Sequence, residues 1–337
     1  MSATTASSQR GPASIHPIVD PGVEDRALLA LAKMLRAADY RFITGSPASH
    51  ARVNQREGNQ WARNVVDVLG WSRPFHVEIL PPAIFALMQA AAVIQPFDNG
   101  WRSTVRFSTL PGSGSRQELL VHSAYPTLDS DAVFFGPDTY RFNRALLHFL
   151  DRRERTIGRA LDVGTGSGAG AIVIARESPG AVVIASDINT HALRLARVNV
   201  LLAEASGVTV QHSDLFERIS GDFDLIVANP PFLIDPEQRA YRHGGGARGE
   251  GFTLTLLQAA LPRLVSGGTL LIYTGVAIVD GVDPLLARLR NILTPLHLQW
   301  TYREVDPDIF GEELAGETYA DTDRIAAVVL TVTSTNQ

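Results

Sequence analysis

Cysteine is absent from this 337-residue chain, and among its 30 lysine and arginine residues only Lys33 is lysine. Without cysteine the chain can form no disulfide, no thiolate metal site, no iron–sulfur cluster and no thiol nucleophile. A single lysine, in a segment with helical periodicity, also argues against a Walker phosphate loop and against Schiff-base chemistry. Any catalysis must therefore work without thiols or amines.

Long apolar segments are missing as well. The longest such stretch, Ile79–Ile94, includes two consecutive prolines and Gln89, and it is too short to cross a bilayer. The polar, small residues 1–14 lack the apolar core that a signal peptide needs. The sequence therefore predicts a cytoplasmic protein with no membrane partner.

The net charge of −5 is divided unevenly along the chain. Residues 1–150 carry 14 basic and 12 acidic side chains, whereas residues 151–337 carry 16 and 23. Because acidic surfaces repel a phosphate backbone, an anionic substrate would have to be held by the first half or by the loop 239–248. The nine histidines show no metal-ligand spacing, so we expect no metal.

The first half of the chain reads as a polar leader followed by a mostly helical region. We expect residues 1–20 to be disordered and residues 21–130 to form an N-terminal substrate-recognition domain. Helical signals cover 24–40, 60–68 and 83–92, and a hairpin is predicted from strands 101–108 and 117–124.

From residue 131 onward the pattern predicts a catalytic domain, 131–337, of the α/β class. After a short strand at 131–135 and a helix at 138–150, strands and helices alternate, which indicates a parallel, Rossmann-like sheet covered on both faces. The predicted strands are 159–163, 181–186, 208–211, 223–228 and 268–275, and the predicted helices are 167–177, 190–205 and 250–264. Two last strands, 298–304 and 324–333, should add an antiparallel edge.

A glycine-rich turn, Ala160–Gly170, joins the first of these strands to its helix. Gly164 and Gly166 allow a tight turn and close approach to a ligand, in front of a helix N-terminus that favours negative charge. This spacing alone also fits a dinucleotide site or a merely tight turn. Asp162 favours another ligand, because its carboxylate would repel a pyrophosphate but suits the amino group of an amino-acid-bearing cofactor.

Two further carboxylates follow neighbouring strands. Asp187 ends the second strand, where an acid can accept both ribose hydroxyls of an adenosine, although it could instead cap the next helix. Asp214 follows the third strand and is a candidate for the adenine amino group, with a surface turn as the alternative.

The motif Asn229-Pro230-Pro231-Phe232 directly follows the predicted strand 223–228. Two prolines fix the backbone and remove two N–H donors, so the asparagine side chain and nearby carbonyls project as acceptors. A pair of acceptors suits a planar –NH2 group, on whose face Phe232 would stack. A proline-rich turn is the alternative interpretation.

Together the glycine and Asn-Pro-Pro-Phe motifs resemble the class I S-adenosylmethionine (SAM) methyltransferases. The similar branch is that of the small-domain N-methyltransferases, which includes glutamine-N5 methyltransferases of release factors and of a ribosomal protein, and rRNA guanine-N2 and tRNA adenine-N6 enzymes. The resemblance covers about residues 131–334. It implies a seven-stranded class I sheet, SAM as the cofactor and S-adenosyl-L-homocysteine as its product.

The resemblance also implies roles for individual residues. Asn229, the Pro230 carbonyl and Phe232 would act on the target nitrogen. The residues that it implies for SAM binding are Asp162, Gly164, Thr165, Gly166, Gly168, Asp187, Ile188, Asp214, Leu215 and Asn229.

Two flanking segments share the resemblance. Phe134–Thr139 is similar to the Pro-x-Pro-[Asp/Glu]-Thr element of the glutamine enzymes, with Phe135 in place of the first proline, and the glycine-rich 241–251 is similar to the stretch before their next helix. The residues implied for the substrate are Asp138, Thr139, Pro231, Arg242 and Arg248.

The sequence leaves more than one class of methyl acceptor open. The leading hypothesis is methylation of a protein glutamine side chain; an RNA base or a small-metabolite nitrogen is the alternative. A nucleotide-dependent oxidoreductase and a non-catalytic SAM-binding module are the other classes. Phe232 does not decide the acceptor, because glutamine enzymes often have tyrosine there and several RNA enzymes have phenylalanine.

An arginine-rich region in the first half is a candidate docking face for RNA or an acidic protein surface, or simply a solvated face. Its basic residues are Arg41, Arg52, Arg56, Arg63 and Arg73.

Overall fold

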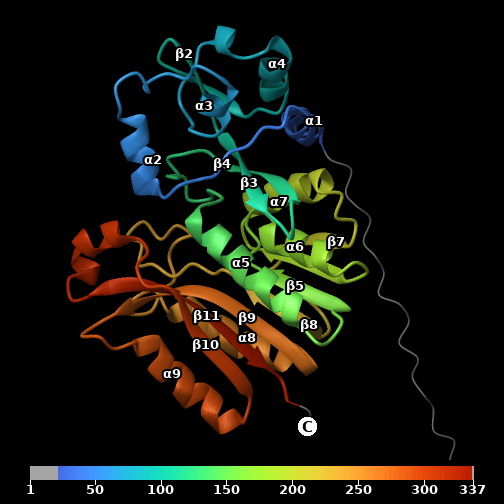
Figure 1. Cartoon of the computed structure of the whole chain (residues 1–337), viewed down its shortest axis with the longest axis vertical. Coiled ribbons are helices and arrows are strands. Elements are labelled where there is room, and N and C mark those ends of the chain that lie inside the picture. Colours follow the sequence, from blue (N-terminus) through green and yellow to red (C-terminus); the bar gives the residue numbers. More distant parts are fainter. Residues whose placement is uncertain (1–21, 336–337) are drawn as a thin grey trace, which may run out of the picture.

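The computed structural model describes residues 22–335, so the predicted disordered leader, 1–20, lies outside the described residues. The larger part of the fold is a mostly parallel sheet of seven strands, in the order β10-β11-β9-β8-β5-β6-β7 (Figure 1). Five neighbouring strands run parallel, namely β9, β8, β5, β6 and β7. At one edge of the sheet, β11 pairs antiparallel with β9 and β10 pairs antiparallel with β11. The predicted seven-stranded α/β sheet with an antiparallel edge is confirmed.

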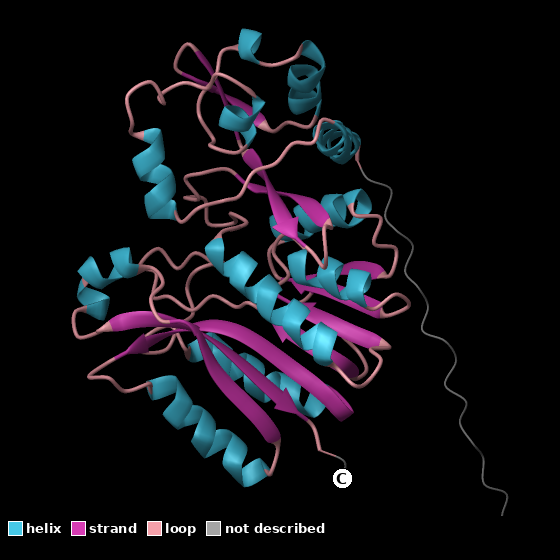
Figure 2. Cartoon of the chain, in the orientation of Figure 1, coloured by secondary structure: helices cyan, strands magenta, loops and turns pink. Residues whose placement is uncertain are grey.

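Most strands of this sheet lie where the sequence predicts them. The strands are β5 (Arg159–Val163), β6 (Val182–Asp187), β7 (Val208–His212), β8 (Phe223–Ala228), β9 (Leu264–Ile278), β10 (Gln299–Asp306) and β11 (Arg324–Thr333). Helices cover both faces, and they are α5 (Pro137–Arg152), α6 (Ala169–Glu177), α7 (Thr190–Leu202), α8 (Gly251–Ala260) and α9 (Pro284–Leu293) (Figure 2).

Alternation along the buried strands explains the two helical layers. In β8, Leu225 and Val227 point into a core shared with α5 and α6, whereas the intervening Ile226 points into a second core shared with α8 and α9. A strand that is buried on both faces has a continuous apolar run, as seen in 225–228.

The N-terminal region stacks on one end of the sheet (Figure 1). Its helices are α1 (Val23–Ala37), α2 (Pro47–Asn54), α3 (Val65–Leu69) and α4 (Pro82–Ala90), and its strands are β1 (Ile94–Phe97), β2 (Gly100–Ser103), β3 (Val105–Pro111) and β4 (Gln117–Ser123). Their core includes apolar residues of α7. Asn199 of α7 also bonds both the N–H and the carbonyl of Val121 on β4, at 2.8 and 2.9 Å. This hydrophobic core therefore includes residues on both sides of the predicted domain boundary at 130/131, and the boundary stays a prediction.

Several local predictions are wrong. Residues 131–135 form no strand; the N–H of Val133 is bonded by the Ser123 side chain instead of a strand partner. The helix predicted at 60–68 is reduced to α3, because Asn64 caps its start and the N–H of Ala62 bonds the Pro74 carbonyl. The strand predicted at 101–108 is divided between β2 and β3, which belong to different two-stranded sheets.

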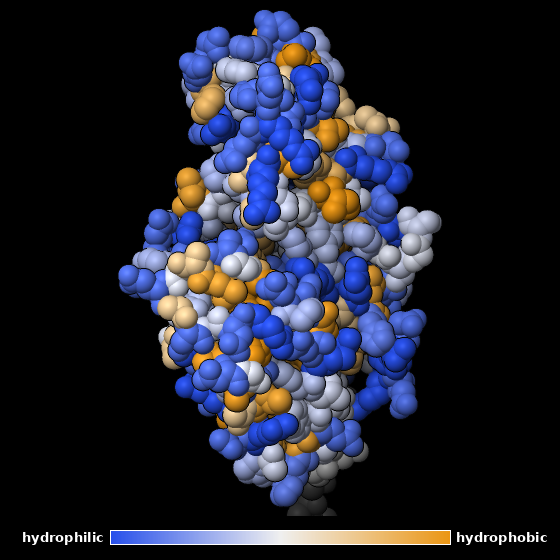
Figure 3. All heavy atoms as spheres, turned by 60° about the vertical axis from the view of Figure 1, so that its left-hand side comes forward, coloured by the Kyte–Doolittle hydropathy of each residue, from blue (hydrophilic) through white to orange (hydrophobic). Residues whose placement is uncertain are grey.

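Two helices, α2 and α9, were not predicted from the sequence. Both carry ordinary start signals, since Ser46 and Asp283 accept the N–H of Ser49 and of Leu286, and a proline follows each cap. Within residues 22–335 no helix is long and apolar enough to span a membrane. On the face turned forward in Figure 3, hydrophobic side chains form separate patches among hydrophilic ones.

Candidate active site

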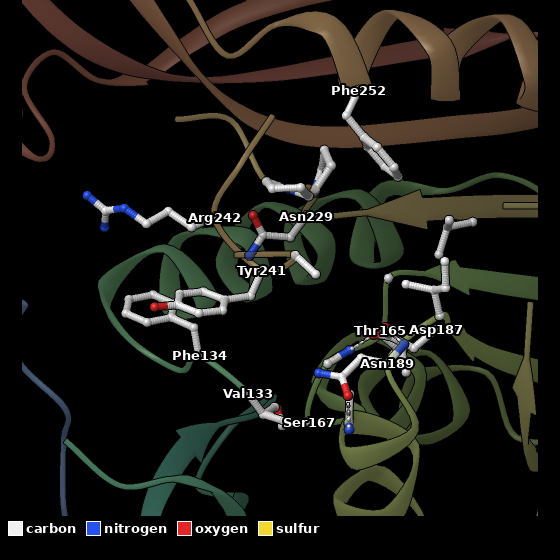
Figure 4. Close-up of a pocket in the computed structure, with 18 of the residues that line it drawn as sticks. Val133, Phe134, Thr165, Ser167, Asp187, Asn189, Asn229, Tyr241, Arg242 and Phe252 are labelled. Atoms are coloured by element: carbon white, nitrogen blue, oxygen red, sulfur yellow. Dashed lines mark hydrogen bonds between the residues drawn. The ribbon is translucent and has the colours of Figure 1, made fainter. Parts of the chain in front are cut away.

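A cavity of about 370 Å³ lies at the carboxyl ends of β5, β6 and β8. Ligands of open α/β sheets bind at this edge, because the loops after the strands converge there. All sequence-predicted site residues except Gly168 and Arg248 line the cavity. Figure 4 shows Thr165 and Asp187 on one side of it, and Asn229, Tyr241 and Phe134 on the other.

The glycine turn forms one wall. Gly164 and Gly166 both have positive φ, +66° and +55°, which L side chains rarely adopt. A Cβ on Gly164 would meet no atom within 4 Å, so this backbone faces open space. Gly168 instead caps α6, with φ +83°, and lies 3.4 Å from the Ala196 Cβ when its own Cβ is built. Gly168 thus lies against α7 and outside the cavity lining, and its contact with the cofactor stays a prediction.

Asp162 lies buried beneath the turn, with 2% of its surface exposed. One carboxylate oxygen accepts the Thr165 hydroxyl at 2.6 Å and the Ala171 N–H at 2.9 Å. Burial raises the pKa of Asp162 to about 7, against the opposing effect of these two hydrogen bonds. Asp162 thus ties the turn to the start of α6 while facing the cavity.

Asp187 stands at the end of β6 with both oxygens partly used. Oδ2 accepts the Gly166 N–H and Oδ1 the Asn189 N–H, each at 2.9 Å. Burial raises the pKa of Asp187. Each oxygen keeps a further acceptor site for a ligand. The neighbouring Ile188 is half-exposed at the cavity.

Asp214 and Leu215 line the cavity beyond Asp187. They belong to the turn after β7, in which Leu215 adopts φ +44°. The Asp187 carbonyl accepts the Ser213 N–H at 3.1 Å, which fixes this turn against the end of β6.

Asn229 occupies the opposite wall, immediately after β8. Among residues 22–335 its side-chain amide has no hydrogen-bond partner, although it lines the cavity with Pro230 and Pro231. A polar side chain in a pocket without a protein partner is available to a ligand. Figure 4 shows its amide directed to the space beside Tyr241.

Phe232 lines the cavity with little of its surface exposed. Only 8% of its surface is exposed, and its ring packs edge-on against Tyr273 and Phe310, at centroid distances of 6.4 and 5.9 Å. Gly275 leaves room for the ring, because a Cβ there would overlap it. The ring is therefore anchored in the core, and its stacking on the acceptor stays a prediction.

Asp138 and Thr139 line the cavity from the start of α5. The Tyr273 hydroxyl donates to Asp138 at 2.6 Å, and Arg141 lies 3.4 Å away. Burial raises the pKa of Asp138 in spite of these partners. The Thr139 hydroxyl oxygen accepts the Gly136 N–H at 3.3 Å, so it helps to hold the helix start.

Five aromatic residues of the cavity were not predicted as site residues from the sequence, among them Phe142 of α5. Phe134 and Tyr241 stack with an interplanar angle of 8°, and the Tyr241 hydroxyl donates to the Thr127 carbonyl at 2.6 Å. Phe252 of α8 and Phe310, between β10 and β11, also line the cavity. These residues come from separate segments. Phe134 and Tyr241 begin the two flanking segments of the resemblance, but the resemblance assigns neither of them a role.

The arginines predicted to contact a substrate are engaged in ion pairs. Arg242 bonds Glu313 and points away from the cavity (Figure 4), and Arg248 bonds both oxygens of Asp321 at 2.6 Å, outside the cavity. In the N-terminal face, Arg73 is buried against Asp67 at 2.6 Å. Arg41 and Arg63 have acidic partners, whereas Arg52 and Arg56 have none within the described residues.

Metal chemistry has no candidate site in the described part of the chain. Residues 22–335 contain no cluster of three or more histidine, aspartate and glutamate side chains that could hold an ion.

Comparison with known proteins finds a family that is similar to the second half of the chain. Residues 131–278 match the model of the methyltransferase small domain. This segment is therefore similar to that family. The resemblance to class I SAM methyltransferases is thereby confirmed, since the family match covers both the glycine turn and the Asn-Pro-Pro-Phe motif.

Relatives of this methyltransferase domain are named for glutamine. The chain is 35% identical over 202 residues to the release factor glutamine methyltransferase of Deinococcus radiodurans, covering 56% of this chain and 66% of the relative. That of Koribacter versatilis is 33% identical over 188 residues, with 52% and 62% covered. The ribosomal protein uL3 glutamine methyltransferase of Neisseria meningitidis serogroup A is 36% identical over 138 residues, with 36% and 44% covered. The chain thus spans less than two thirds of each of these relatives.

Proposed function

We propose that this protein is a SAM-dependent N-methyltransferase whose acceptor is the carboxamide nitrogen of a glutamine side chain in a protein. The observation that carries the proposal is the Asn229 amide, which has no partner in the described chain and faces the same cavity as the glycine turn and Asp187. The names of the relatives, release factor and ribosomal protein uL3 glutamine methyltransferases, support the glutamine acceptor.

The cavity residues fit SAM. The open space in front of Gly164 allows a ligand to approach the backbone, and Asp187 offers one free acceptor site on each oxygen for the two ribose hydroxyls. Asp162 would face the amino group, and Asp214 the adenine amino group. When bound, SAM supplies an electrophilic methyl group on a positively charged sulfur.

The chemistry left to the protein is to prepare a poor nucleophile. The lone pair of a carboxamide nitrogen is delocalised, and its N–H groups are too weakly acidic to be removed first. If the Asn229 side-chain oxygen and the Pro230 carbonyl accept the two N–H groups, the nitrogen is oriented and the positive charge that develops on it is stabilised. Correct positioning of two reactants can supply about 7–11 kcal/mol of the barrier.

The paired arginines support a protein acceptor over RNA. Arg242 at the cavity, and Arg239 and Arg248 outside its lining, all have acidic partners. Recognition of a phosphate backbone depends on cations that are free to neutralise it. The mouth of the cavity is therefore better suited to a neutral side chain.

The test is to label a lysate of cells that lack the enzyme, using methyl-labelled SAM and purified protein. We expect the label to be protease-sensitive and RNase-resistant, and mass spectrometry to place one added methyl group on a glutamine side chain. Purified release factor and ribosomal protein uL3 are the first acceptors to assay. Label in RNA or in small molecules would overturn the proposal. The same assay is applied to the variant Asn229→Ala, and its control is Gln89→Ala, which removes an exposed side-chain amide of α4.

A further inference from the structure

The connection between β10 and β11, residues 307–323, contributes Phe310 to the lining of the cavity. It contains two short 3-10 helices, η4 (Gly311–Ala315) and η5 (Glu317–Tyr319). Figure 1 shows it in red at the left end of the sheet, beside the loop that follows the Asn-Pro-Pro-Phe motif. The sequence analysis predicts only the two flanking strands and assigns no role to this connection.

Phe310 extends from the connection into the cavity. Its backbone has φ +52°, an unusual conformation for a bulky residue, and its ring lies 5.9 Å from Phe232 with an interplanar angle of 61°. The conformation is held on both sides, since the Ile309 N–H donates to the Ile325 carbonyl at 2.7 Å and the Glu313 N–H to the Phe310 carbonyl at 2.9 Å. Strained residues fixed by their surroundings concentrate at functional sites.

Three contacts tie the connection to the loop after the motif. The Tyr319 hydroxyl accepts the Ile234 N–H at 2.9 Å, and Tyr319 itself is buried. Glu313 bonds Arg242, which also lies 3.7 Å from the buried Asp235. Asp321 bonds Arg248 through both oxygens at 2.6 Å. Arg242 and Arg248 thereby hold the connection against residues 234–248.

The position of Phe310 distinguishes it from the SAM side of the cavity. It packs on Phe232, which directly follows the prolines, whereas the glycine turn, Asp187 and Asp214 come from β5, β6 and the turn after β7. A glutamine side chain carries two methylene groups below its carboxamide, and an apolar ring is a suitable surface for them.

We propose that the β10–β11 connection is the element that selects the methyl acceptor, and that Phe310 contacts the acceptor side chain. The inference rests on the proposed function for the identity of that side chain. It assigns Glu313, Tyr319 and Asp321 as positioning residues that hold Phe310 in place.

The experiment compares Phe310→Ala, Phe310→Leu and the wild type. Phe149→Ala is the matched control, because Phe149 is a half-buried phenylalanine on the same core that does not line this cavity. We measure the Kd for SAM by calorimetry, the Tm, and methyl transfer from labelled SAM to the lysate at increasing lysate concentration. Phe310→Ala should raise the half-saturating acceptor concentration about tenfold or more, with the Kd for SAM within about twofold of wild type and a smaller effect in Phe310→Leu.

Unchanged acceptor saturation in Phe310→Ala would overturn the inference, and so would a loss of SAM affinity of the same size. If Phe310→Ala does not fold, Phe310→Leu and the double variant Glu313→Gln/Asp321→Asn decide instead, since both should weaken acceptor saturation without changing the Kd for SAM. If the wild type labels something other than glutamine, the proposed function fails. The inference is still judged by the ratio of variant to wild type on the acceptor that is labelled.

Discussion

The two sides of the cavity are built in different ways. The proposed SAM side comes from consecutive strand–turn–helix units, in which Asp162, Gly164 and Asp187 lie at the carboxyl ends of the adjacent strands β5 and β6. The proposed acceptor side combines Asn229 with aromatic residues of distant segments, Phe134, Tyr241 and Phe310. In our proposal the cofactor site is therefore encoded by local sequence, whereas the acceptor site depends on tertiary structure, and substitutions should separate the two.

The largest expected effect is on the acceptor side. Asn229→Ala should lower kcat about 100- to 1000-fold, because it removes a preorganised acceptor that acts on the developing charge. The Kd for SAM should stay close to that of the wild type, as measured by calorimetry beside labelled methyl transfer. Turnover like that of the wild type would contradict the role of Asn229.

Asp187→Asn should produce the opposite pattern. Hydrogen bonds to a charged group contribute about 1.5–3 kcal/mol, so SAM affinity should fall about 10- to 100-fold. The new –NH2 group would also oppose one of the N–H donors of Gly166 and Asn189. Titration with SAM measures the loss of affinity. Asp214→Asn should lose less SAM affinity, because in our proposal Asp214 bonds a single amino group. An unchanged Kd in Asp187→Asn would remove Asp187 from the cofactor site.

The pH dependence of SAM binding should be set by Asp162. Its pKa is raised to about 7 by burial, and a cationic ligand favours the carboxylate, so binding at lower pH must release a proton. SAM affinity should thus increase up to about tenfold per pH unit below pH 7 and level off above it. Calorimetry in buffers of different ionisation enthalpy counts the proton, and Asp162→Asn should abolish the dependence.

The same group affects stability with a defined sign. Because the pKa of Asp162 is higher in the folded protein than in the unfolded chain, the folded state binds more protons between about pH 4 and 7. The contribution of Asp162 to the free energy of unfolding is complete below this window and is lost as the pH rises through 7. Denaturant unfolding of the wild type and of Asp162→Asn at several pH values between about 4 and 7 measures this contribution. A free energy of unfolding that rises with pH in the wild type relative to the variant would contradict the sign.

The smallest expected effect concerns the ion pairs of the β10–β11 connection. Glu313→Gln should lower the free energy of unfolding by about 1 kcal/mol or less, because the pair is partly solvated and Arg242 keeps Asp235 nearby. Asp39→Asn, which breaks an exposed pair with Arg41, is the control and should cause no measurable change. A loss of SAM affinity in Glu313→Gln would show that the two sides of the cavity are not separable.

Sequence patterns predicted the buried sheet better than its surroundings. The bounds of β5, β8 and β11 agree with the predicted 159–163, 223–228 and 324–333, since these strands are mostly apolar segments between turns. The mostly apolar segment 131–135 misled the prediction, because the Ser123 N–H donates to the Val133 carbonyl but the Val133 N–H donates to the Ser123 side chain, so no regular strand pairing forms.

The same contrast applies to the candidate site. Local spacing was enough to bring Asp162, Gly164, Asp187 and Asn229 to one cavity. It could not show that Arg248 is bonded by Asp321, 73 positions further along the chain. The role that we propose for Phe310 could not be predicted from local sequence either, because it arises only when the β10–β11 connection folds against the loop after Phe232.

The most direct test of the account is to measure SAM binding and methyl transfer together in Asn229→Ala and Phe310→Ala. The account predicts a Kd for SAM within about twofold of wild type in both variants, with transfer to the acceptor reduced in each. Loss of SAM binding in parallel with transfer would contradict it, because the cavity would then not contain separate cofactor and acceptor sides.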